Sequence, residues 1–187
     1  MTEMRRGANV ELTREIPSLQ TVLLGVQIGI GAEASVRDSL VAATILTDAR
    51  SRALSDEHFV FFNQLVTPEE SVTQRATALG PDFEQIEVSL PSVPAEVERI
   101  VVLMYLNEGP VQRRSLSQLR EIRVRVVDAA DGAELVRSEN LVPTTLEVSA
   151  VSLGELYRHD GGWKFKVLGE GYREGVLGVA KDFGVGL

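Results

Sequence analysis

The stretch that decides the fold is residues 153–172, LGELYRHDGGWKFKVLGEGY. Within it Trp163, Phe165 and Val167 alternate with lysines, so one face of an extended chain is apolar and the other is charged. The Asp-Gly-Gly run at 160–162 is typical of a tight turn, because glycine adopts positive φ at little steric cost. The stretch therefore predicts a half-buried antiparallel β-hairpin.

Strand signals dominate the rest of the chain. Segments rich in β-branched and apolar residues, separated by turn residues, predict strands at residues 21–30, 40–47, 59–64, 85–90, 100–106, 122–127, 146–158 and 163–169. Short helical segments are expected at 92–98, at 116–120 and at 175–183, the last ending at Gly184. Because helices between strands are scarce, we predict an all-β fold, an antiparallel β-sandwich of two sheets with a few short helices.

Length and composition narrow the class of protein. The 187 residues predict a single domain, residues 1–187, large enough to fold without a metal or disulfide. The absence of cysteine excludes thiolate metal sites and cysteine nucleophiles and fits a cytoplasmic location. The net charge of −8 argues against nucleic-acid binding. No apolar run is long enough to span a membrane, and no apolar stretch follows Arg5-Arg6 as in a signal peptide.

The hairpin stretch resembles the GELYRHNGEWKF-type segment of TerD-domain proteins, the tellurium-resistance and general stress family of bacteria. Four further segments resemble family motifs in the same order along the chain. These are residues 7–13 with the GGNVSLT opening, 22–25 with VLVGLGW, 58–65 with DFIFYNNL, and 112–116 with RRQSF. The resemblance implies a β-sandwich protein that is not an enzyme and that acts in the stress response.

The resemblance also implies calcium binding, and here the chain departs from the family pattern. The stretch similar to the family's DLDAS is residues 39–43, SLVAA, which holds neither aspartate. In the loop similar to GDNRTGEGDGDDE, Asp82 and Glu84 alone match the acidic end. Asn63, at the end of the FFNQL segment, matches a family asparagine. Calcium takes six to eight oxygen ligands, so this loss predicts that binding is abolished or weak. Asp82, Glu84 and Asn63 are therefore candidate residues of a vestigial metal site. We expect no cofactor, and at most weak calcium binding.

Two alternatives stay open beside this interpretation. In the first, the protein is a functional calcium module whose ligands have moved to neighbouring acids, for which the candidates are Asp38, Asp48, Asp56, Glu69 and Glu70. In the second, a pocket serves an enzyme or a small-molecule receptor.

Enzyme chemistry has little support in the sequence. His159 precedes the expected turn and is interpreted as a turn histidine, and no G-x-S-x-G elbow or phosphate-binding glycine loop is present, so we predict no catalytic residues.

A local excess of arginine is the last feature that points to a partner. Residues 112–114, Arg120, Arg123 and Arg125 form a basic concentration in an acidic chain, and we interpret it either as the wet face of a strand or as a docking patch. With the resemblance, it leads us to expect a cytoplasmic binding or scaffold protein whose partners are other TerD-type or membrane-associated stress proteins. We do not expect it to span a membrane or to bind nucleic acid.

Overall fold

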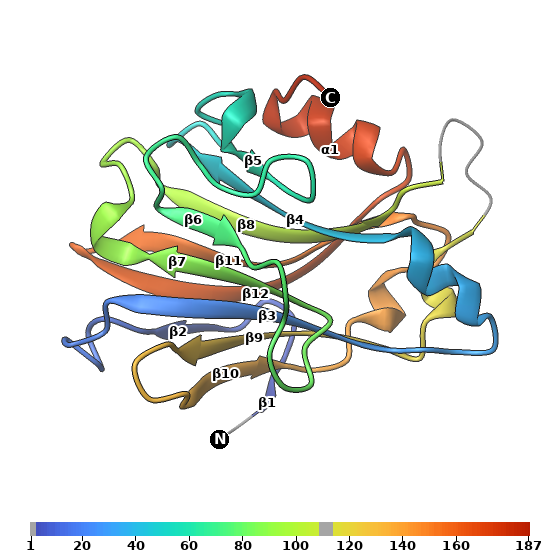
Figure 1. Cartoon of the computed structure of the whole chain (residues 1–187), viewed down its shortest axis with the longest axis horizontal. Helices are drawn as coiled ribbons and strands as arrows, with labels where there is room; N and C mark the ends of the chain where they lie inside the picture. The colour runs from blue at the N-terminus through green and yellow to red at the C-terminus, as the bar shows by residue number, and fades with distance from the viewer. Residues whose placement is uncertain (1–2, 109–113) are drawn as a thin grey trace.

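The computed structural model describes residues 3–108 and 114–187. In this part of the chain two β-sheets pack face to face (Figure 1). The first sheet has the order β1-β10-β9-β3-β7-β6, with bounds Glu3–Met4, Glu134–Ser138, Glu121–Asp128, Thr21–Gly29, Glu84–Ser89 and Val72–Gln74. The second has the order β2-β12-β11-β8-β4-β5, with bounds Asn9–Glu11, Gly162–Tyr172, Ala150–His159, Arg99–Leu106, Leu40–Thr47 and Phe59–Val60. The predicted β-sandwich is confirmed.

The hairpin predicted from the deciding stretch is formed by β11 and β12. His159 pairs with Gly162, which leaves Asp160 and Gly161 as a two-residue turn with φ of 47° and 78°. Positive φ at both central positions matches the right-handed twist of the strands that the turn joins. Trp163 and Phe165 point into the core, as the alternation predicts.

The main core lies between the two sheets. From the first sheet β3 contributes Val22, Leu24 and Val26, and from the second sheet β12 contributes Phe165 and Val167, all fully buried. Successive side chains of a strand point to opposite faces, so each of these strands also presents residues to the outside of the sandwich. What covers these outer faces differs between the two sheets.

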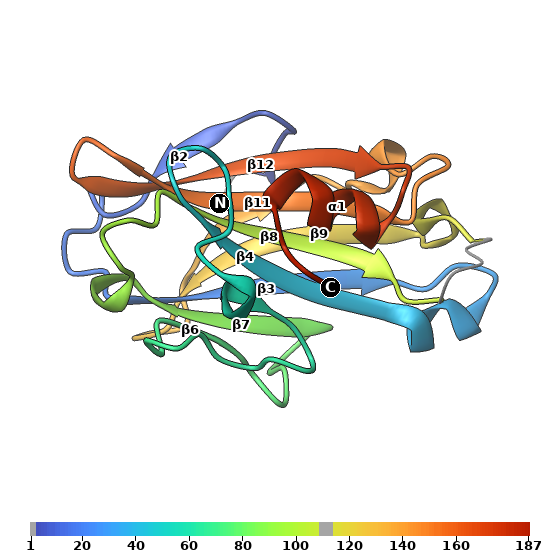
Figure 2. The same cartoon turned by 90° about the horizontal axis from the view of Figure 1, so that it is seen from above.

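One helix covers part of the outer face of the second sheet. Helix α1, Val176–Phe183, packs Val179 and Ala180 on a second apolar cluster that includes Leu103 and Tyr105 of β8. Figure 2 looks down on this helix lying over the strands of that sheet. The helix ends at Gly184, whose φ of 72° is the left-handed cap that the sequence predicts. In the described part of the chain no helix is long and apolar enough to cross a membrane.

Several predicted element bounds were wrong. The strand expected at 59–64 stops at Val60, because Phe61 and Gln64 exchange backbone hydrogen bonds across a turn. The helix expected at 92–98 is absent: a 3-10 turn at Leu90–Ser92 ends where it should begin, and residues 93–98 are not helical. The segment 116–120 forms only a 3-10 turn at Leu116–Gln118. Strand β10 was not predicted, since its sequence ELVRS places a single residue, Val136, in the core.

Candidate functional site

Asp82 is the most buried of the predicted metal-site residues, and its carboxylate already has a cation. Arg125 of β9 donates from Nε to Oδ1 at 2.8 Å and from Nη2 to Oδ2 at 2.9 Å. Gln27 donates to Oδ1 at 3.1 Å and Gln85 to Oδ2 at 2.7 Å. The Asp82 side chain is 0% exposed, so its charge is balanced inside the protein by a bidentate guanidinium.

The backbone of β3 is shaped to admit this pair. A Cβ atom at Gly25 would lie 2.4 Å from Asp82 Oδ2, so only glycine leaves room for the carboxylate at this point of the strand. The hydrogen bond to Asp82 is the main reason that the pKa of Arg125 is raised above its ordinary value. A carboxylate neutralised in this way does not fit the role of a calcium ligand.

Glu84 lies in a different place from Asp82. It lines a cavity of about 310 Å³ together with Asp38, Gln74, Asn107 and the start of β4. Burial raises the pKa of Glu84 above its ordinary value, although Gln74 and the charge of Arg37 act against this rise. The Oε1 atom of Gln74 is buried and has no hydrogen-bond partner in the described part of the chain. The cavity thus holds two carboxylates, Asp38 and Glu84, where calcium usually takes six to eight oxygen ligands.

Asn63 lines a different cavity from Glu84, although the two cavities share Phe62 and Asn107. It is an exposed residue of the turn between Phe61 and Gln64, and it lines another cavity, beside Phe62 and the C-terminal Leu187. The three residues predicted as one vestigial site are therefore not brought together by the fold. Among the residues described, no group of three or more acidic or histidine side chains is placed to hold a metal ion.

The acids considered as relocated ligands are mostly occupied with local structure. Asp48 accepts hydrogen bonds from the backbone N–H groups of Arg50 and Arg52, which lowers the pKa of its carboxyl group. Asp56 accepts from the N–H of Gly186 and so holds the C-terminal segment. Glu70 has a φ of 59° in the turn before β6.

Glu69 belongs to a polar network that the sequence analysis did not find. His58 lies between Ser55 Oγ, 2.7 Å from its Nδ1, and Glu69 Oε2, 2.9 Å from its Nε2. Ser71 donates to the other oxygen of Glu69 at 2.7 Å. Ser55 also caps the 3-10 turn Asp56–His58 by accepting from the N–H of Glu57. This capping pattern, a serine three residues before the histidine, is the one signal in the sequence that could have indicated the network.

The expected arginine patch is largely paired with acids. Arg114 contacts Glu108 and Glu33, and Arg123 contacts Glu121 and Glu3. Arg125 is held by Asp82, as described above, and also lies 3.4 Å from Glu134. Gln112 and Arg113 lie outside the described residues. These contacts balance most of the charge that the docking interpretation relied on, while Arg120 is exposed and has no ion pair within the described residues.

His159 is placed as the sequence predicts. It ends β11 and is half-exposed, with its Nε2 atom 3.2 Å from the carboxylate of Asp160 in the turn. No serine or threonine hydroxyl hydrogen-bonds to its ring in the described structure, so the interpretation as a turn histidine fits its surroundings.

A model of one protein family, the TerD domain, matches residues 1–183. The chain belongs to the TerD domain family. It is 30% identical to Tellurium resistance protein TerD of Serratia marcescens over 190 residues, which cover 97% of this chain and 96% of that protein. It is equally 30% identical to General stress protein 16U of Bacillus subtilis (strain 168) over 191 residues, with the same coverage.

The fold agrees with that of a solved TerD relative. A crystal structure of a homologue of telluride resistance protein (TerD) from Streptomyces coelicolor A3(2) superposes with a TM-score of 0.64 at 14% sequence identity. The alignment covers 86% of this chain and 98% of that one. The predicted TerD resemblance and its β-sandwich are thus both confirmed. Within this fold the carboxylate of Asp82 forms an ion pair with Arg125.

Proposed function

We propose that this protein is a non-enzymatic stress-response protein of the tellurium-resistance type, which acts as a binding or scaffold component and whose calcium binding is lost or weakened. In this proposal it works in the cytoplasm and assembles with other TerD-type or membrane-associated stress proteins. The calcium-binding relatives would respond to the ion, and this chain would take part in the assembly without responding itself.

The observation that carries the proposal is the ion pair between Asp82 and Arg125. A calcium ion at Asp82 would have to displace a bidentate guanidinium from a fully buried carboxylate, and the displaced Arg125 would then lose its main partner. The names of the relatives, a tellurium resistance protein and a general stress protein, support the biological setting.

A non-enzymatic role is supported by the surroundings of the two histidines. His58 is 8% exposed, and both of its ring nitrogens are held, by Ser55 and by Glu69. His159 is exposed and contacts Asp160. A general base must reach the proton it removes from a substrate, and the contacts of His58 serve the packing of its own loop instead.

One observation favours the alternative, a calcium module with relocated ligands. Asp38 and Glu84 line the same cavity as Gln74, whose Oε1 atom has no hydrogen-bond partner among the residues described and is a carbonyl oxygen of the type that binds calcium. This cavity is therefore where calcium would bind if the proposal is wrong.

Thermal unfolding of EDTA-treated protein with and without millimolar calcium tests the proposal. A ligand that binds only the folded state raises the melting temperature by mass action. We expect no shift. A rise of several degrees that disappears in the double variant Asp38→Asn/Glu84→Gln would overturn the loss of calcium binding and assign the ion to the cavity of Glu84. The assembly role is tested separately by capture of partners from stressed cells, where the absence of any TerD-type protein would count against it.

A further inference from the structure

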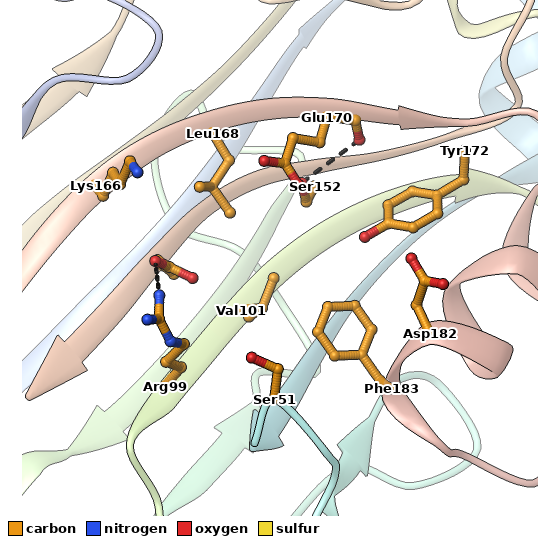
Figure 3. A pocket seen from close by; sticks show the side chains of 11 residues that line it. Ser51, Arg99, Val101, Ser152, Lys166, Leu168, Glu170, Tyr172, Asp182 and Phe183 are labelled. Carbon is orange, nitrogen blue, oxygen red and sulfur yellow. Dashed lines mark hydrogen bonds and ion pairs between the residues drawn. The ribbon is translucent and has the colours of Figure 1, made fainter. Parts of the chain in front are cut away.

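A second cavity, unrelated to the expected calcium region, lies on the outer face of the second sheet. It has a volume of about 330 Å³ and is lined by side chains of β8, β11, β12 and the end of α1 (Figure 3). Helix α1 covers the neighbouring apolar part of this face and leaves the polar part open. A half-open cavity of this size suits a small molecule.

Bulges in the sheet place a buried acid in this cavity. Strand β11 shifts register against both neighbours between Ser152 and Gly154, and Gly169 of β12 has a φ of 92°. Because of the shift, Ser152 and Glu155 both point outward although they are three residues apart, which simple alternation would not allow. Glu155 thereby becomes a carboxylate only 5% exposed.

Glu155 is only partly satisfied by the protein. Arg99 donates to its Oε1 at 2.6 Å, and no hydrogen bond to its Oε2 is found in the described structure. Burial is the main reason that the pKa of Glu155 is raised above its ordinary value, and the charge of Glu170 adds to the rise. Lys166 lies beside this pair, and its ammonium group makes no ion pair within the residues described. At this end of the cavity the ammonium group of Lys166 is therefore available to bind an anion.

The opposite end of the cavity is acidic. Figure 3 shows the hydroxyl of Tyr172 and the carboxylate of Asp182 pointing into the cavity at the end away from Lys166 and Arg99. Burial, together with the charges of Asp182 and Glu170, raises the pKa of Tyr172 to about 12. The side-chain carboxylates of Glu170 and Asp182 have no hydrogen-bond or ion-pair partner in the described residues. The charges of both acids reach the Tyr172 hydroxyl, so a cation beside this hydroxyl would be attracted by two carboxylates.

The surface between the two ends is partly apolar. Val101 and Leu168 lie between them, and the ring of Phe183 lies beside Asp182 (Figure 3). The aromatic rings of Tyr172 and Phe183 add a preference for an organic cation, since an ammonium group is attracted to the face of an aromatic ring. The cavity thus offers a site for an anion, an apolar surface and a site for an ammonium group, in that order.

We propose that this cavity binds a small zwitterion of the amino-acid class, whose ammonium group lies between Glu170 and Asp182 and whose carboxylate lies against Lys166. The proposal does not depend on the scaffold function or on the loss of calcium binding. It assigns to the outer face of the second sheet a small-molecule site, separate from the cavity of Glu84.

Calorimetric titration with a series of ω-amino acids tests the proposal. The probes are glycine, β-alanine, γ-aminobutyrate and ε-aminocaproate, compared with n-butylamine and butyrate, which carry one charge each. We expect one member of the series to bind up to about fivefold more tightly than either singly charged analogue, since a partly exposed ion pair contributes up to about 1 kcal/mol. Equal binding of the amine and the best zwitterion, or no binding of any zwitterion, would overturn the proposal.

Two variants locate the ligand and distinguish its ends. In Lys166→Met the zwitterion should bind no more tightly than butylamine. In the double variant Glu170→Gln/Asp182→Asn the zwitterion should bind no more tightly than butyrate. Lys164→Met is the matched control, because Lys164 lies on the same strand and outside this cavity. Glu170 and Asp182 are exposed, whereas the two lysines are partly buried, so melting curves must show that each variant stays folded. Loss of binding in the control alone, or unchanged binding in the other two variants, would place the ligand elsewhere and contradict the assignment.

Discussion

A single arginine changes what an acidic residue can do in this protein. Asp82 matches the acidic end of a loop that the family resemblance connects with calcium, yet its carboxylate is held by Arg125 and two glutamines. Arg125 was interpreted from the sequence as part of the wet face of a strand. In the structure its side chain is 14% exposed and lies across β3 at Gly25, where no other residue would leave space.

Removal of the Asp82 carboxylate should be costly. In Asp82→Ala the guanidinium of Arg125 stays largely buried without its main partner, and we expect the free energy of unfolding to fall by about 3–5 kcal/mol. The measurement is urea unfolding. The double variant Asp82→Ala/Arg125→Met should recover most of this loss, because it leaves no buried charge unpaired. Glu174→Ala, at an exposed position, is the control. A double variant that is as unstable as the single one would show that packing, and not charge, explains the loss.

At the scale of elements, helix α1 divides the outer face of the second sheet into two parts. Its apolar residues cover the cluster around Leu103 and Tyr105, and its last turn borders the open polar part with Asp182. The helix has only eight residues, which is too short to be stable alone, so its stability depends on the sheet beneath it.

Truncation of one side chain tests how firmly α1 is held. Val179 is fully buried, and Val179→Ala should lower the free energy of unfolding by about 2 kcal/mol, through lost burial and the cavity left behind. Leu177 is 66% exposed on the same helix, so Leu177→Ala should change stability by less than about 0.5 kcal/mol. Chemical unfolding of both variants gives the comparison. Equal losses would mean that the face we describe as buried is not the one that holds the helix.

The stability of the whole molecule should depend on pH through Glu69, whose contact with His58 joins an edge strand of one sheet to an edge strand of the other. Glu69 lies just before β6 of the first sheet and contacts His58, which lies just before β5 of the second sheet. Burial alone would raise the pKa of Glu69, but hydrogen bonds from Ser71, from its own backbone and from His58 outweigh it and lower that pKa. A lowered folded pKa means that the ionised carboxylate stabilises the folded state.

The contribution of Glu69 should be lost on acidification. It is present above the pKa of the unfolded chain, about 4.5, and disappears as the pH falls through the lower folded value. Glu69→Gln should therefore be less stable than the wild type at neutral pH, with the difference shrinking below pH 4.5. Glu155→Gln is the contrast, since the raised pKa of Glu155 means that its ionised form opposes folding above about pH 4.5. Urea unfolding as a function of pH measures both, and a Glu69→Gln difference that grows on acidification would contradict the assignment.

The sequence alone determined the framework of this protein. Alternation of apolar and polar residues and the turn at Asp160-Gly161 predicted the hairpin of β11 and β12, because both are local properties of the chain. The same reasoning located β3, β4 and the end of α1 at Gly184. It failed for β10 and for the bound of β5, where pairing with a neighbouring strand, and not local composition, decides the structure.

Only the tertiary structure decided which polar groups meet. Asp82 and Arg125 are 43 residues apart, and Arg99 and Glu155 are 56 apart, so no local pattern could pair them. The face of β11 to which Glu155 points also depends on a bulge, and this bulge is defined by the pairing of β11 with its two neighbouring strands. Charge pairing acts through space and over a few ångströms, which is why Asp82 could be named from the sequence while its pairing with Arg125 could not.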